Sequence, residues 1–288
     1  IKAVLLKPNF AEAYYNLGNT LNLLGRSHEA ILSFNRAVKI KSDYPEAYNN
    51  LGMILENILR LEEALINYER AIRLKPDYSD ACYNSANILT KLGKYHGAVN
   101  RYNRAIELKP KFAEAYYNLG NAHNELGHYR DAIISYERAT KLRPNYAEAH
   151  NNLGNSLKNL NKYHEAIASY KKAIKFEPKY TQAYSNLANC LKDTGRHDEA
   201  VLCYQRSIIF RPDHAIGYNN LGTLINDFGK YAKAINFYKR AIKITPNYAD
   251  AHNNIGHARN NLGRSKKAYS NYKNAIKLFP GFVEAYWN

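Results

Sequence analysis

Asparagine recurs at 34-residue intervals along the chain, and this is the spacing that most clearly indicates chemistry. The first series comprises Asn16, Asn50, Asn84, Asn118, Asn152, Asn186, Asn220, Asn254 and Asn288. A second series lies three residues later, at Asn19, Asn87, Asn121, Asn155 and Asn189. A carboxamide carries an acceptor oxygen and two N–H donors, so it can bond both the C=O and the N–H of a peptide backbone. The pattern therefore predicts binding of extended or disordered protein segments with little regard to their side chains.

These asparagines belong to a 34-residue unit that repeats along the chain. Proline sets the register, at Pro8, Pro76, Pro110, Pro144, Pro178, Pro212, Pro246 and Pro280. With this proline at position 32, the complete units are 11–44, 45–78, 79–112, 113–146, 147–180, 181–214, 215–248 and 249–282. Residues 1–10 read as the end of a preceding unit and 283–288 as the start of another. We interpret residues 1–288 as a single repeat array, which we expect to belong to a longer protein.

Each unit is predicted to form two helices, A and B. Positions 4, 7, 8 and 11 carry apolar or small residues, the spacing of one helical face. A glycine near position 15, or Asn161 in one unit, is expected to end helix A in the left-handed conformation. Helix B has alanine at position 20 and an aromatic at position 24 throughout, and the following proline prevents its continuation. Pairs such as Asp77 with Asp80 predict a capping box at the next helix A.

The combination of an aromatic at 4, Leu at 7, Gly at 8, Ala at 20 and Pro at 32 resembles the tetratricopeptide repeat. The resemblance covers essentially the whole chain. It implies an all-α fold, a right-handed superhelical solenoid of helix-turn-helix tetratricopeptide repeats. It also implies that the face of helix A bearing positions 2, 6, 9 and 13 lines a concave groove, which holds the asparagines of both series.

The units further resemble the repeat region of O-linked N-acetylglucosamine transferases, in stretches such as residues 113–133 and 183–208. The sequence has no counterpart of that family's catalytic region. The resemblance therefore implies a substrate-recruiting region at most, and a protein-interaction scaffold in general.

Two other functions remain open. The formal net charge is +16, and Lys and Arg concentrate on helix B at positions 26 and 29, a basic stripe of the kind that attracts nucleic acid. No nucleic-acid motif accompanies the stripe, and position 2 of helix A is mostly acidic, so we interpret it as a solvated outer face. The second alternative is a structural or assembly protein that self-associates through its end units, because uncapped solenoid ends expose apolar surface.

No residues predict catalysis, a metal ion or a cofactor. There is no HExxH or CxxC motif, and the ten histidines show no metal-ligand spacing. We therefore predict that the chain is not an enzyme and binds neither metal nor cofactor. No apolar run approaches the roughly 18 residues of a membrane span. The three cysteines and the absence of any N-x-[ST] glycosylation acceptor favour an intracellular, cytoplasmic setting, although a targeting segment could lie outside this sequence.

Overall fold

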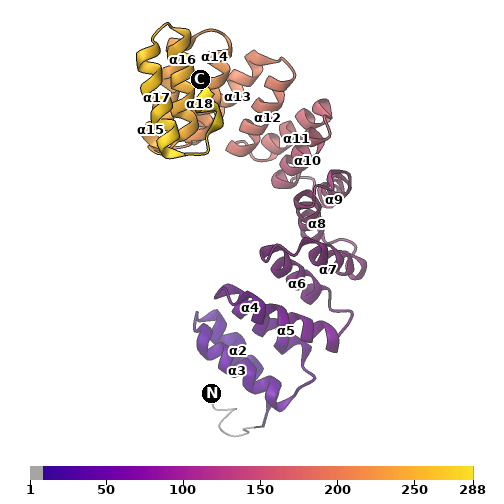
Figure 1. Cartoon of the computed structure of the whole chain (residues 1–288). Helices are drawn as coiled ribbons and strands as arrows, with labels where there is room; N and C mark the ends of the chain where they lie inside the picture. Colours follow the sequence, from indigo (N-terminus) through magenta and orange to yellow (C-terminus); the bar gives the residue numbers. More distant parts are fainter. Residues whose placement is uncertain (1–8, 288) are drawn as a thin grey trace. The chain divides into compact units, whose positions relative to one another are not determined.

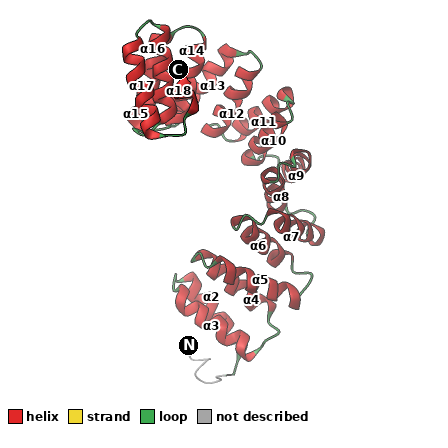
Figure 2. Cartoon of the chain, in the orientation of Figure 1, coloured by secondary structure: helices red, strands yellow, loops and turns green. Residues whose placement is uncertain are grey.

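The structure is a computed structural model that describes residues 9–287 (Figure 1). Over this range the chain forms helices joined by short turns and contains no strand (Figure 2). The chain divides into two compact units, residues 1–144 and 145–288. No helix in residues 9–287 combines the length and apolar character needed to cross a membrane.

Consecutive helices pair into antiparallel hairpins, each made of one A helix and one B helix. The hairpins of the first unit are α2 (Ala11–Leu23) with α3 (Ser27–Ile40), α4 (Pro45–Asn57) with α5 (Leu61–Leu74), α6 (Ser79–Lys91) with α7 (Tyr95–Leu108), and α8 (Ala113–Glu125) with α9 (Tyr129–Leu142). Those of the second are α10 (Ala147–Asn159) with α11 (Tyr163–Phe176), α12 (Thr181–Asp193) with α13 (His197–Phe210), α14 (Ala215–Asp227) with α15 (Tyr231–Ile244), and α16 (Ala249–Asn261) with α17 (Ser265–Leu278). A short helix, α18 (Val283–Trp287), follows. The prediction of an all-helical repeat solenoid is confirmed.

The aromatic at position 24 packs directly on the small residue at position 8 of the same hairpin. Tyr170 is fully buried, and a Cβ atom built on Gly154 would lie 2.6 Å from its ring. Gly120 and Tyr136 repeat this contact, also at 2.6 Å. Glycine lets the backbone of helix A touch the ring face of helix B, so the hairpin core is filled without a void.

The turn between helices A and B contains one left-handed residue. Gly127 has a φ of 72° and Asn161 a φ of 59°, as the sequence predicted. Leu59 occupies the same place in the second hairpin with a φ of 61°, and its side chain is 79% exposed. A left-handed conformation costs a residue with a Cβ roughly 1–2 kcal/mol. Leu59 therefore stores strain that no burial offsets.

The predicted capping box at the start of helix A is wrong. Helix α6 follows Tyr78 as its N-cap residue, and no side-chain hydrogen bond caps it. The N–H of Tyr78 donates to the carbonyl of Lys75 at 3.1 Å and closes a four-residue turn. Pro76 and Asp77 are the central residues of that turn, and both types favour turns. The residue expected to cap the helix therefore shapes the turn before it.

Replacing Leu59 with glycine should raise the free energy of unfolding by up to about 1 kcal/mol, because it removes the left-handed strain and little burial is lost. Urea unfolding followed by circular dichroism measures the change. The reciprocal variant Gly127→Leu should lower stability. An unchanged or lower stability for Leu59→Gly would contradict the strain.

Replacing Gly154 with alanine should lower the free energy of unfolding by about 1–3 kcal/mol, because the new methyl group meets the ring of Tyr170. Alanine is otherwise the better helix former by about 1 kcal/mol. Gly97 supplies the control, because a Cβ there lies 3.4 Å from Leu89, an ordinary contact. Gly97→Ala should therefore be neutral or stabilising in the same unfolding experiment, and equal effects of the two substitutions would refute the packing explanation.

Candidate functional site

The asparagine at position 6 bonds the preceding hairpin through its amide nitrogen. The Nδ2 of Asn118 donates to the hydroxyl of Tyr83 at 3.1 Å and to Oδ1 of Asn87 at 3.1 Å. Asn50 forms the same pair of bonds with Tyr15 at 3.1 Å and Asn19 at 2.9 Å. The carboxamide therefore joins one A helix to the A helix before it.

The acceptor of this bond changes with the residue at position 5 of the preceding hairpin. Where that residue is asparagine, its Oδ1 replaces the tyrosine hydroxyl. These bonds join Asn84 to Asn49 at 3.2 Å, Asn186 to Asn151 at 3.0 Å and Asn254 to Asn219 at 3.1 Å. Position 5 of the sixth repeat is Ser185, whose hydroxyl lies 2.8 Å from that of Ser207. The donor is thus constant in type while its acceptor varies.

The asparagine at position 9 accepts a hydrogen bond from the buried tyrosine at position 24. The bonds run from Tyr102 to Asn87 at 2.7 Å, from Tyr136 to Asn121 at 2.7 Å, from Tyr170 to Asn155 at 2.9 Å and from Tyr204 to Asn189. Burial raises the pKa of Tyr170 above its ordinary value, so its hydroxyl stays protonated and donates. A buried hydroxyl needs such a partner, and position 9 supplies it.

Hairpins without asparagine at position 9 show that the tyrosine hydroxyl at position 24 needs another acceptor. In the second hairpin position 9 is Met53, and the hydroxyl of Tyr68 donates instead to Oε2 of Glu56 at 3.0 Å. In the last complete hairpin position 9 is His257, and the buried hydroxyl of Tyr272 has no partner among the described residues. The asparagines at position 9 of the third to sixth hairpins are therefore part of the hairpin core.

Several asparagines of each series have one end of the carboxamide bonded within the protein and the other end unbonded among residues 9–287. The half-buried position-6 residues whose Oδ1 bonds no other described residue are Asn84, Asn118, Asn220 and Asn254. The half-buried position-9 residues whose Nδ2 is likewise unbonded within residues 9–287 are Asn19, Asn87, Asn155 and Asn189. Position 6 thus offers an acceptor and position 9 a donor. The sequence predicted both ends of every carboxamide to be available, and in all of these residues except Asn220 packing engages one of the two ends.

The two asparagine series together are called the asparagine ladder below. Its other predicted residues differ in their surroundings. Asn16 is exposed, and Oδ1 of Asn50 accepts a bond from Asn49 at 3.3 Å. Oδ1 of Asn152 accepts one from Asn151 at 3.1 Å, and Oδ1 of Asn186 accepts one from Gln182 at 3.2 Å. Asn288 lies outside the described residues. The open acceptors are therefore a subset of the position-6 series.

The basic residues of helix B lie partly on tyrosine rings. The guanidinium carbon of Arg138 lies 6.0 Å from the ring centroid of Tyr116 at position 4 of the same hairpin. Arg36 over Tyr14 and Arg240 over Tyr218 show the same separation. This is the distance at which a cation is attracted to an aromatic face. Part of the basic stripe thus packs against the helical hairpin itself.

Stacked helical hairpins whose A helices are joined by a polar ladder define a helical-repeat scaffold. Family profiles described as tetratricopeptide repeat match residues 11–44, 45–78, 147–180, 181–214 and 249–282. A profile described as TPR repeat matches residues 86–127, 120–161 and 227–263. Together these matches span most of the sequence, and the chain belongs to the tetratricopeptide repeat family.

Solved structures of this fold include YrrB, described as "a TPR protein with an unusual peptide-binding site", and MamA. YrrB is 23% identical, with a TM-score of 0.57 over 64% of this chain and 95% of YrrB. Two crystal structures of MamA are 26% and 27% identical, with TM-scores of 0.52, and they cover 58% and 56% of this chain and 91% and 94% of MamA. A comparison with curated protein sequences found no match.

Replacing Tyr170 with phenylalanine should lower the free energy of unfolding by about 1 kcal/mol, because Asn155 loses its buried hydrogen-bond donor. The matched variant Tyr272→Phe removes a hydroxyl that has no partner in residues 9–287, so it should be neutral or stabilising. Urea unfolding of the two variants measures the difference. Equal losses would show that the hydrogen bond from Tyr170 to Asn155 does not contribute to the free energy of unfolding.

Proposed function

We propose that the chain is a non-catalytic protein-interaction scaffold that binds extended protein segments along the groove face of its A helices. The observation that carries the proposal is the opposite orientation of the two asparagine series. On α6, Asn84 presents Oδ1 and Asn87 presents Nδ2, so a guest meets an acceptor and a donor one helical turn apart. A peptide backbone needs this pair, because every residue except proline carries one N–H and one C=O.

The inward bonds prepare the ladder for binding. Both N–H groups of Asn118 have partners, which fixes the plane of its carboxamide before a guest arrives. A side chain that is already ordered loses little rotamer entropy on binding, whereas ordering a free polar side chain costs about 0.5–1.5 kcal/mol. The tyrosine hydroxyls orient Asn155 and Asn189 in the same way. The hydrogen bonds that stabilise the repeats thus also pre-organise the groove face.

Spacing sets the number of contacts a guest can make. Neighbouring packed helices lie about 8–10 Å apart, and an extended chain advances about 3.3 Å per residue. Each A helix would then meet roughly every third residue of the guest. Contacts with the backbone alone allow guests of many sequences to bind. The mostly acidic residues at position 2 and the varied residues at position 13 would supply any preference between guests.

Two comparisons bear on this proposal. The description of YrrB assigns a peptide-binding site to a protein of the same fold. The repeat phrases at residues 113–133 and 183–208 resemble the recruiting region of O-linked N-acetylglucosamine transferases. A more specific proposal is that the chain recruits substrates within a longer glycosyltransferase. This proposal rests on those two sequence stretches alone. Whether the full-length protein carries a nucleotide-sugar-binding α/β region tests it directly.

The sharpest test removes the Nδ2 donor of the position-9 asparagines and keeps the oxygen that accepts the tyrosine hydroxyl. In the triple variant Asn87→Asp, Asn155→Asp and Asn189→Asp, each carboxylate still accepts the tyrosine hydroxyl, while the outward N–H groups are lost. Binding to an array of unstructured 15-residue peptides, followed by fluorescence anisotropy on the strongest binders, should weaken about tenfold or more. That loss corresponds to one or two hydrogen bonds of about 1 kcal/mol each.

The control carries the same charge change on exposed positions of helix B, as Asn100→Asp, Asn236→Asp and Asn274→Asp. It should bind as the parent chain does. Backbone N-methylation of the bound peptide should weaken binding to the parent chain, since it removes the donors that Oδ1 accepts. Unchanged binding of the ladder variant, or equal loss in the control, would refute the groove mechanism.

A further inference from the structure

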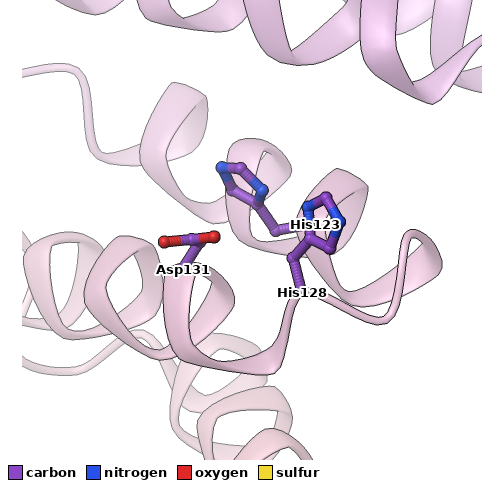
Figure 3. A group of neighbouring side chains, drawn as sticks. All are labelled: His123, His128 and Asp131. Atoms are coloured by element: carbon purple, nitrogen blue, oxygen red, sulfur yellow. The ribbon is translucent and has the colours of Figure 1, made fainter.

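The fourth hairpin brings two histidines and an aspartate together at the turn between its helices (Figure 3). His123 lies in the last turn of α8, His128 directly precedes α9, and Asp131 lies in the first turn of α9. Their possible ligand atoms all lie within 4.8 Å of one another. Within residues 9–287, no other group of three His, Cys, Asp or Glu side chains meets this condition.

The turn itself holds the group together. Gly127 adopts a φ of 72°, and the N–H of His128 donates to the carbonyl of His123 at 2.9 Å. The chain therefore reverses between the two histidines and places both on the same end of the hairpin. Asp131 follows His128 by three residues, a spacing that puts both on one side of the first turn of α9.

Other hairpins use the same place for an ion pair. Positions 16 and 19 hold arginine and glutamate in the pairs Arg26–Glu29 at 2.6 Å, Arg60–Glu63 at 2.6 Å and Arg196–Glu199 at 2.7 Å. In the fourth hairpin these positions are His128 and Asp131, and His123 occupies position 11, where leucine is usual. The fourth hairpin therefore keeps an acidic residue at position 19 but has a histidine in place of arginine at position 16. His123 supplies a second imidazole beside them.

The groups of this cluster are poorly satisfied by the protein alone. His123 is half-buried, and its Nδ1 is buried without a hydrogen-bond partner among the described residues. The carboxylate of Asp131 forms no hydrogen bond or ion pair within that same part of the chain. A buried polar atom without a partner costs about 1–3 kcal/mol, and a coordinated ion would remove the cost for His123.

We propose that His123, His128 and Asp131 bind a divalent transition-metal ion, with Zn²⁺ as the preferred ion. Imidazole nitrogen and carboxylate oxygen are ordinary zinc ligands, at about 2.0–2.2 Å. Ligand atoms around a tetrahedral ion are therefore closer together than the 4.8 Å limit of this group. His128 and Asp131 are exposed and free to rotate inward. The ion would cross-link the end of α8 to the start of α9.

Three protein ligands leave a fourth position open. His123 and Asp131 also line a cavity of 620 Å³, together with Tyr116, Ser135 and Arg138. An ion held at the edge of that cavity would keep a water molecule, or accept a donor atom from a molecule bound there. His96 from α7 is the other neighbour, with its ring centroid 6.4 Å from that of His128. None of these residues belongs to the asparagine ladder, so the metal-binding proposal and the peptide-binding proposal can be tested independently.

Titration calorimetry with Zn²⁺ on the whole chain, first treated with a chelator, tests the proposal. The parent chain should bind one equivalent in a saturable step, and Zn²⁺ should raise its thermal unfolding midpoint. His128→Ala and Asp131→Asn change exposed residues, so the fold should persist. Each should weaken binding at least about tenfold, because losing a direct ligand costs no less than losing a residue that only supports one.

The controls are His164→Ala, an exposed histidine of the second unit, and His96→Ala. His164→Ala should bind Zn²⁺ as the parent chain does. A loss in His96→Ala comparable to that in His128→Ala would add His96 as the fourth ligand and support the site. Absence of saturable binding by the parent chain, or unchanged binding by both His128→Ala and Asp131→Asn, would overturn the proposal. So would an equal loss in His164→Ala, which would indicate unspecific binding to surface histidines.

Discussion

The structure of each unit depends on one contact, the buried aromatic ring of helix B on the small residue of helix A. At Gly154 and Gly120 the ring occupies the space that a Cβ would need. Close packing of this kind fixes the separation and rotation of the two helices, because neither can shift without a clash or a void. A tyrosine ring so placed also buries its hydroxyl, and that hydroxyl must find an acceptor. The asparagine at position 9 follows from this requirement.

The same network orients the carboxamides that we propose to bind a guest. The hydroxyl of Tyr102 donates to Asn87, and Asn87 also accepts a bond from Asn118 of the next hairpin. A carboxamide has two chemically different ends, so using one end in packing determines which end faces the groove. Position 9 is held by its oxygen and position 6 by its nitrogen. On α6 this leaves the acceptor of Asn84 and the donor of Asn87 unbonded three residues apart, the pair on which the proposed peptide binding rests.

Departures from the repeat are as informative as its regularities. Leu59 in a left-handed turn and Tyr272 with an unpartnered hydroxyl are places where one hairpin lacks the residue that the others use. At the turn of the fourth hairpin, His128 and Asp131 replace an arginine–glutamate pair, and His123 replaces an apolar residue. We expect the first two departures to cost stability, and neither assembles groups that could bind a ligand. The third assembles groups of complementary chemistry in one place, which is why it carries a functional inference.

The amino-acid sequence by itself determined the helices, the turns between them and the residues that pack inside each hairpin. These features depend on contacts between residues that are near in the chain, so a 34-residue period displays them directly. The sequence also identified both asparagine series, but it did not show that packing engages one end of some carboxamides and both ends of others. It misread Asp77 as a cap, because the hydrogen bond from Tyr78 to Lys75 that defines the turn leaves no trace in residue type.

Only the tertiary structure decided the partners of the ladder, since they lie 31 or 35 residues away in the chain, as Asn87 and Tyr83 do from Asn118. It also brought His123, His128 and Asp131 together across a reversal of the chain, where the linear spacing fits no metal-ligand motif. The physical reason is the same in both cases. Hydrogen bonds and coordination depend on the positions and orientations of individual atoms, and a periodic pattern of residue types specifies the helices that carry those atoms but not where their side chains meet.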